Sequence, residues 1–98
     1  MKILEMSYGA FREFIESRGA KIPKSCPSCD SQELWNVDKE NPDVVFGQSS
    51  FEEIKYIINA PNYKRLDFGH FILECGNCGF SHYYVLAPMV EDWFRKNE

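Results

Sequence analysis

The sequence lacks the short motifs that mark common enzyme classes. It contains no glycine-rich phosphate loop, no H-E-x-x-H and no G-x-S-x-G. The zinc-deaminase pattern is also missing, because His70 is followed by Phe71 and Ile72 instead of x-Glu. The carboxylates show no distinctive pairing. We therefore expect that this protein is not an enzyme and has no small-molecule substrate.

Long apolar runs and an excess of basic charge are also absent. No apolar stretch approaches the roughly 20 residues that cross a bilayer, and residues 1–5 lack the apolar core of a secretory signal. The formal net charge is −4, which suits non-specific phosphate binding poorly. We expect a cytoplasmic protein with no membrane contact, and nucleic acid is the less favoured partner.

No cysteine lies outside two C-x-x-C pairs, the first knuckle Cys26–Cys29 and the second knuckle Cys75–Cys78. This spacing lets both sulfurs of a pair turn inward around a tight loop, and Zn²⁺ takes four thiolates at about 2.3 Å. Turn-forming residues fill both loops: Pro27, Ser28, Gly76, Asn77 and Gly79. The pattern predicts one structural Zn²⁺ held by Cys26, Cys29, Cys75 and Cys78. Four protein ligands would close the coordination sphere.

Other uses of the cysteines fit less well. Two disulfides require an oxidising compartment. A thioredoxin-type redox motif explains one pair but not two, and an iron centre is a further alternative. His82 follows Cys78 by four residues and His70 lies upstream, but four cysteines leave no need for a histidine ligand. We expect His82 to be a strand residue beside the site.

The chain length of 98 residues favours one α+β domain with a modest core, for which a structural metal is a common supplement. We expect a single zinc-ribbon domain over 1–98, with a small antiparallel sheet flanked by helices. Its parts are a leading helix within 1–20, a ribbon over 26–86 with an inserted helix at about 50–59, and a terminal helix over 87–98.

Cap and period signals support the three helices. Ser7 and Gly19 bracket residues 8–18, where Tyr8, Phe11 and Ile15 form an apolar stripe that we expect to pack in the core. Ser50 and Glu53 fit a capping box before the second helix. Pro88 marks the first turn of the third helix, whose apolar stripe favours core or dimer contact.

Apolar runs between turn residues predict the strands. The expected strands cover residues 33–37, 43–46, 66–74 and 80–86. The last two would form an antiparallel hairpin with the second knuckle at its tip. Phe71 and Leu73 would share one face and Ile72 and Glu74 the other, so both faces are partly apolar and we expect both to be covered.

Five residues form the candidate nucleic-acid surface. Cations hold phosphates and an adjacent aromatic ring can stack on bases, but the short basic stretch at 62–65 is equally well explained as a loop before a strand. The candidates are Lys21, Lys24, Tyr63, Lys64 and Arg65.

The two knuckles, Cys26-Pro27-Ser28-Cys29 and Cys75-Gly76-Asn77-Cys78-Gly79-Phe80, resemble those of the zinc-ribbon (rubredoxin-like) superfamily. With the leading helix and Trp35 after the first knuckle, the layout is also similar to small uncharacterised zinc-ribbon proteins of bacteria and phages. The resemblance implies a structural zinc and a cytosolic setting, but no substrate. One departure is Asp30, which stands where such ribbons often have glycine.

These observations lead to three hypotheses of function. We expect a non-enzymatic zinc protein that acts as a protein-interaction or self-association module, through the surfaces of its 15% aromatic residues. A nucleic-acid-binding zinc ribbon, for example in transcription, is the first alternative. A thiol redox protein is the second.

Overall fold

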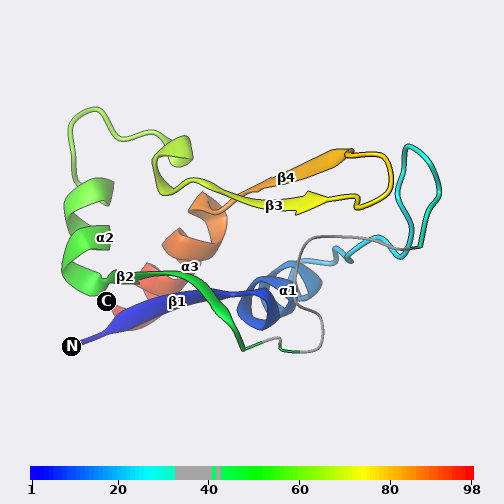
Figure 1. The fold of residues 1–98 in the computed structure, drawn as a ribbon. Coiled ribbons are helices and arrows are strands. Elements are labelled where there is room, and N and C mark those ends of the chain that lie inside the picture. Colours follow the sequence, from blue (N-terminus) through cyan, green and yellow to red (C-terminus); the bar gives the residue numbers. More distant parts are fainter. Residues whose placement is uncertain (33–40, 42) are drawn as a thin grey trace.

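The computed structural model describes residues 1–32, 41 and 43–98 as an α+β fold with three α-helices and two small antiparallel sheets (Figure 1). The first sheet pairs β1 (Ile3–Ser7) with β2 (Val45–Ser50), and the second pairs β3 (His70–Glu74) with β4 (Ser81–Val85). The helices are α1 (Tyr8–Ser17), α2 (Phe51–Ile58) and α3 (Ala87–Asn97). A short 3₁₀ helix, η1 (Arg65–Phe68), precedes β3.

Helix α1 begins and ends as its sequence predicts. The Ser7 hydroxyl accepts a hydrogen bond from the Ala10 N–H at 3.0 Å. At the other end Gly19 has φ +86° and the Ala20 N–H reaches back to the Ile15 carbonyl, which forms a Schellman turn. Each of these contacts satisfies a backbone group that the helix itself cannot pair.

The other two helices are also confirmed. The Ser50 hydroxyl accepts from the Glu53 N–H at 3.2 Å, as expected of an N-cap. Pro88 lies in the first turn of α3, where its missing N–H costs no hydrogen bond. The Phe51 ring of α2 stacks on Phe94 of α3 with centroids 5.0 Å apart, so this apolar face of α3 is a core contact.

The core lies where the three α-helices, β1 and the β3–β4 hairpin meet. The predicted α1 stripe of Tyr8, Phe11 and Ile15 is buried. Phe11 stacks on Phe71 of β3 with centroids 4.2 Å apart and the rings nearly parallel. Phe71 and Leu73 therefore hold one face of the hairpin against the helix.

The expectation that both faces of the hairpin are covered is wrong for the described residues. Ile72, Tyr83 and Val85 are 38%, 60% and 39% exposed on the outer face. His70 lies opposite Val85 in the ladder, and Ile72 lies opposite Tyr83. An uncovered apolar face therefore extends along β3 and β4.

Two strand predictions need correction. The strand expected over 66–74 begins only at His70, because residues 65–68 form η1 and Gly69 breaks the chain direction with φ +80°. The Asp67 carboxylate accepts the Lys64 N–H at 3.1 Å, which stabilises the turn locally. The strand expected over 43–46 begins at Val45 and continues to Ser50.

The leading segment also differs from expectation. Residues 3–7, which we placed before a helix and within a helical unit of 1–20, form β1 and pair with β2. The single sheet that we expected is therefore two separate two-stranded sheets. The strand expected over 33–37 lies outside the described residues.

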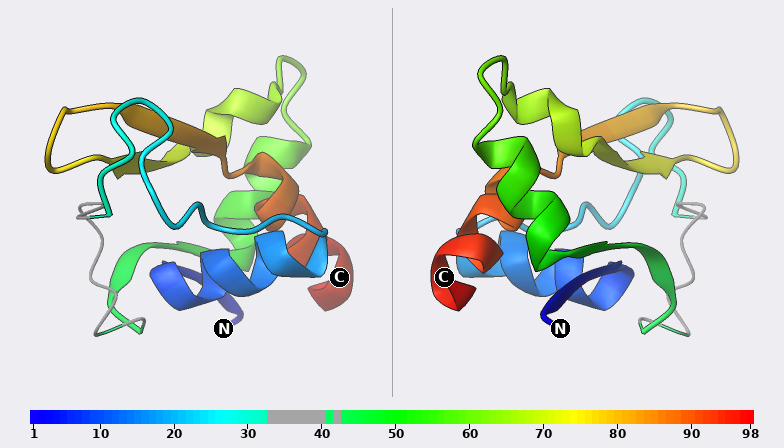
Figure 2. Two further views of the ribbon diagram at one scale, coloured as in Figure 1. Left: turned by 90° about the vertical axis from the view of Figure 1, so that its right-hand side faces the viewer. Right: turned by 90° about the vertical axis from the view of Figure 1, so that its left-hand side faces the viewer.

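The ends of the chain meet on one side of the fold, away from the hairpin tip (Figures 1 and 2). The Lys2 ammonium donates to the Asn97 carbonyl there and lies 5.1 Å from the centre of the Phe51 ring. Within the described residues, no helix is long and apolar enough to span a bilayer.

Candidate metal centre

The structure brings all four cysteines together at the tip of the β3–β4 hairpin. Their sulfurs lie within 4.8 Å of one another, although the pairs are separated by more than 40 residues of sequence. Cys26 Sγ and Cys78 Sγ are 3.7 Å apart, as are Cys29 Sγ and Cys75 Sγ. A tetrahedral zinc with four bonds of about 2.3 Å would separate its sulfurs by about 3.8 Å. The donor set therefore fits a tetrahedral metal ion.

Both knuckles are built on the same hydrogen bonds. In the first, Cys26 N–H donates to the Ser31 carbonyl at 2.9 Å and Asp30 N–H donates to the Cys26 carbonyl at 2.8 Å. In the second, the equivalent bonds run from Cys75 to Phe80 at 2.8 Å and from Gly79 to Cys75 at 2.9 Å. Each loop is thus closed around its sulfurs by the backbone alone.

The residue after each knuckle has a left-handed backbone. Gly79 has φ +82°, which glycine adopts without steric cost. Asp30 has φ +61° and is the one non-glycine residue with positive φ in the described part of the chain. Asp30 therefore occupies the turn position that glycine fills in the other knuckle, and it does so at some conformational cost.

Backbone and side-chain N–H groups point at the sulfurs. Cys26 Sγ accepts from the Ser28 and Cys29 N–H groups at 3.3 and 3.5 Å. Cys29 Sγ accepts from the Asn77 side-chain amide, which belongs to the other knuckle, at 3.4 Å. Such donors stabilise negative charge on sulfur, so they favour thiolates at this site.

The four thiols do not ionise alike. The Asn77 amide, followed by the Ser31 N–H, lowers the pKa of Cys29 from 9.0 to about 6. The Cys78 N–H lowers the pKa of Cys75. The Phe80 N–H lowers the pKa of Cys78, but hydrogen bonding to Cys29 and burial outweigh it and raise that pKa to about 11.

Hydrogen bonding between the sulfurs contributes to these opposed shifts. Neighbouring sulfurs cannot all carry a negative charge at these separations, so one thiol keeps its proton while another loses it. A divalent cation at the centre would remove this conflict, because thiolate ligands are deprotonated when a metal binds. The chemistry of the donor set therefore agrees with the geometry.

Neither histidine joins the sulfur cluster. His70 begins β3 at the end of the hairpin opposite the knuckle. His82 lies in β4 next to the site, where its ring stacks on Tyr84 with centroids 4.8 Å apart. Among the described residues, the group that could hold a metal contains only the four cysteines.

Three of the five nucleic-acid candidates lie around η1, where two are bound to Glu91 of α3. Arg65 pairs with the Glu91 carboxylate at 2.8 Å, and the Tyr63 hydroxyl donates to it at 2.5 Å. Burial and this hydrogen bond raise the pKa of Tyr63 to about 12. Arg65 and Tyr63 therefore hold the segment before β3 against α3. No pattern in the sequence indicated this contact, because Glu91 lies far along the chain.

The other two candidates lie in a groove beside α1. Lys21 and Lys24 line a hollow of about 520 Å³ together with Arg12, whose guanidinium pairs with Glu16 at 3.4 Å. The sequence pattern placed Arg12 on the outer face of the helix but could not bring it to the two lysines. The groove carries an excess of positive charge in an otherwise acidic chain.

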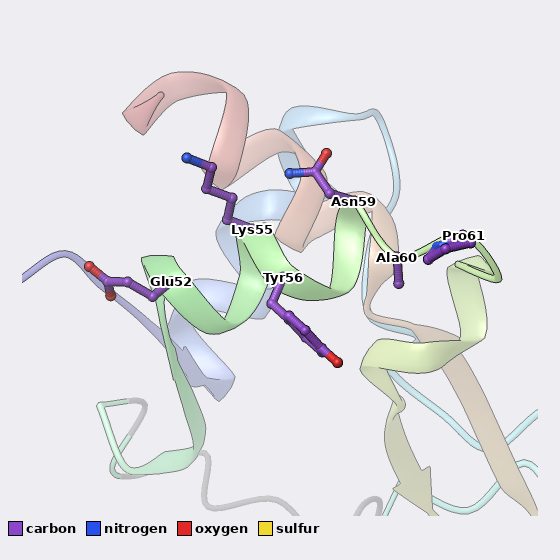
Figure 3. Close-up of a pocket in the computed structure, with 6 residues that line it drawn as sticks. All are labelled: Glu52, Lys55, Tyr56, Asn59, Ala60 and Pro61. Atoms are coloured by element: carbon purple, nitrogen blue, oxygen red, sulfur yellow. The ribbon is translucent and has the colours of Figure 1, made fainter.

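A further hollow of about 460 Å³ lies on α2 and the turn after it (Figure 3). Figure 3 shows Lys55 and Asn59 on one side of the helix and Tyr56 on the other. Tyr56 is 80% exposed. No set of titratable groups converges there among the residues that line it, so the cysteine cluster is the chemically distinctive site.

Comparisons with family models, curated proteins and solved structures find no match for this chain. The assignment of the site therefore rests on its own chemistry and geometry.

Proposed function

We propose that the four cysteines bind one Zn²⁺ ion and that the domain is a zinc ribbon stabilised by it. The clustering of the four sulfurs within 4.8 Å, with two separations of 3.7 Å that suit tetrahedral zinc, carries this proposal. All four sulfurs belong to free thiols, which is the form that binds zinc after deprotonation. A reducing compartment, such as the cytoplasm, would keep them so.

The proposed role of the zinc is structural. Four thiolates fill a tetrahedral coordination sphere, so no position is left for water or substrate. The metal would join the first knuckle, which lies in an irregular segment, to the tip of the β3–β4 hairpin, more than 40 residues away along the chain. A domain of this size has a small core, and the ion would stabilise the fold at the edge of that core. We therefore propose a non-enzymatic role for this site.

The proposed activity is binding to another protein or to a second copy of this chain. The uncovered apolar face of β3 and β4, with Ile72, Tyr83 and Val85, supports it. Contiguous exposed apolar residues on a small soluble domain are typical of contact surfaces. Tyr83 is well suited to such a surface because its ring packs while its hydroxyl stays hydrated.

Native mass spectrometry of the purified protein, repeated after denaturation in acid, tests the metal proposal. One zinc per chain that is lost in acid supports it. A metal-free mass lower by four hydrogens would mean two disulfides and would favour the thiol redox alternative.

Light scattering during gel filtration tests self-association. A concentration-dependent dimer that Tyr83→Glu abolishes, with the zinc content unchanged, would support a role for the outer face. The control is Tyr56→Glu, because Tyr56 is also highly exposed but lies on α2. A chain that remains monomeric and binds no other protein through this face would overturn the interaction proposal.

The groove of Arg12, Lys21 and Lys24 supports a second candidate function, binding of a nucleic acid. Fluorescence anisotropy with labelled single-stranded RNA and DNA at low salt tests it. The groove predicts a steep salt dependence that Lys21→Glu with Lys24→Glu removes. Lys64→Glu with Arg65→Glu is the comparison, since Arg65 is already paired with Glu91. Absence of binding at low salt would rule out this function.

A further inference from the structure

The four cysteines differ in their access to solvent. Cys26 and Cys75 are buried, with exposed fractions of 1% and 3%. Cys29 and Cys78, the second cysteine of each knuckle, are exposed. A reagent that attacks the centre from solution would therefore meet Cys29 or Cys78 first.

The two exposed sulfurs differ in their hydrogen-bond donors. Cys29 Sγ accepts from the Ser31 backbone and from the Asn77 side chain, which reaches across from the other knuckle. Cys78 accepts from the Phe80 backbone. Its other hydrogen-bond partners are the sulfurs of Cys26, Cys29 and Cys75.

The asymmetry comes from one pair of equivalent positions. Asn77 is the third residue of its knuckle, and Ser28 is the third residue of the other. Ser28 donates its backbone N–H to Cys26 within its own knuckle. The side chain of Asn77 is long enough to contact Cys29 across the site, at 3.4 Å.

A hydrogen bond to a thiolate draws charge from the sulfur and makes it a weaker nucleophile. In the zinc-loaded centre all four sulfurs would be thiolates, so access and hydrogen bonding to each sulfur decide which cysteine reacts first. We propose that Cys78 is the site at which soft electrophiles first modify this centre, and that the Asn77 amide protects Cys29. This inference rests on the proposed zinc site.

N-Ethylmaleimide is a suitable probe because its reaction is simple. The cysteine sulfur adds to one carbon of the ring double bond, the π bond opens, and the other carbon takes a proton from water. The product is a thioether of defined added mass, and no oxidant is required. A modified sulfur is a poor metal ligand, so each addition at the site should also release zinc.

The test treats the zinc-loaded protein with less than one equivalent of the reagent and locates the adduct by peptide mass mapping. Zinc release is followed with a chromogenic chelator. We expect the first adduct at Cys78, in step with the release of one zinc. Equal modification of both exposed cysteines, or modification of Cys29 first, would overturn the inference.

Substitution of Asn77 tests its protective role. Asn77→Ala should raise the rate of Cys29 modification roughly tenfold, the effect expected from losing one charge-assisted hydrogen bond. Asn77→Leu keeps the size of the side chain without its N–H and should behave in the same way. The φ angle of Asn77 is not positive, so neither change strains the backbone.

Ser28→Ala is the matched control, since it alters the equivalent position of the first knuckle. We expect it to leave the order and rates of modification unchanged. If Asn77→Ala and Ser28→Ala both leave Cys29 protected, the role of Asn77 is wrong. If the purified protein contains no zinc, the proposed function fails instead, and the metal assay made beforehand separates the two results.

Discussion

The first and second knuckles have the same loop geometry, but they differ in the secondary structure that holds them in place. Both close with the same pair of backbone hydrogen bonds and a left-handed residue after the second cysteine. The second knuckle is the tip of the β3–β4 ladder, which Phe71 anchors on α1. The first knuckle follows residues 20–25, which belong to neither a helix nor a strand.

This difference shows which part of the candidate metal site needs support from the rest of the fold. The loop geometry arises from the C-x-x-C spacing and local hydrogen bonds, so it forms equally in both places. The position of each loop must come from other contacts. The hairpin supplies them for the second knuckle, whereas the first would depend more on the metal itself.

Loss of one cysteine should destabilise the protein more than any other change, and the loss should be equally severe in either knuckle. Because both knuckles would share the one proposed zinc ion, Cys75→Ser and Cys26→Ser should each remove zinc and unfold or aggregate the domain. Structural zinc contributes about 10–16 kcal/mol in small domains. Zinc analysis and circular dichroism measure the outcome, with Ser28→Ala as the control. Unchanged melting and metal content in Cys75→Ser would show the assignment to be wrong.

Truncation of a side chain that anchors each knuckle should show how differently the two knuckles are supported. Phe71→Ala removes a buried ring that stacks on Phe11, and we expect it to cost about 3–5 kcal/mol. Ile22→Ala, before the first knuckle, removes a partly buried side chain and should cost less, about 1–2 kcal/mol. Urea unfolding of the zinc-loaded proteins provides both values. Similar costs at the two sites would contradict the proposed difference in support.

Substitution of the left-handed residue after each knuckle should change the free energy of unfolding in opposite directions: Gly79→Ala should lower it and Asp30→Gly should raise it. Gly79→Ala meets no neighbouring atom within 4 Å, so its cost of about 1–2 kcal/mol comes from the backbone alone. Asp30→Gly relieves a similar strain but makes the unfolded chain more flexible, so a gain below about 1 kcal/mol should remain. Urea unfolding with zinc present measures both changes. Destabilisation by both substitutions would mean that Asp30 contributes contacts that outweigh its strain.

The smallest expected effect concerns the approach to the second knuckle through η1. Arg65, followed by Tyr63, lowers the pKa of Glu91 below its ordinary value of 4.5. The ionised carboxylate therefore stabilises the fold above that value, and its contribution is lost as the pH falls through the lowered pKa. Glu91→Gln should cost less than about 1 kcal/mol at neutral pH, because the pair is partly exposed.

The pH dependence of that cost is the check. The difference in unfolding free energy between wild type and Glu91→Gln should stay constant between pH 4.5 and neutral pH and narrow below pH 4.5. Protonation of the cysteines affects both proteins alike and cancels in this difference. A difference that widens in acid would contradict the assigned partners.

The sequence predicted most elements whose signals are local. Ser7, Gly19, Ser50 and Pro88 mark helix ends because each satisfies or omits a backbone group within a few residues. The alternation of Phe71 and Leu73 with Ile72 predicted which residues share a face of β3, but not that only the Phe71 face would be buried. The prediction failed for β1, because residues 3–7 become a strand only by pairing with β2, some 40 residues later.

The sequence by itself determined the pairing of the four thiols in two knuckles, the closure of those knuckles and the helix boundaries, since these depend on spacing and on nearest neighbours. Only the tertiary structure decided that Asn77 contacts Cys29 and that the outer face of the hairpin stays uncovered. It also decided that Glu91 pairs with Arg65 and accepts a hydrogen bond from Tyr63. Each of these joins or separates residues far apart in the chain. Local propensity carries no information about such contacts, because the packing of whole elements places them.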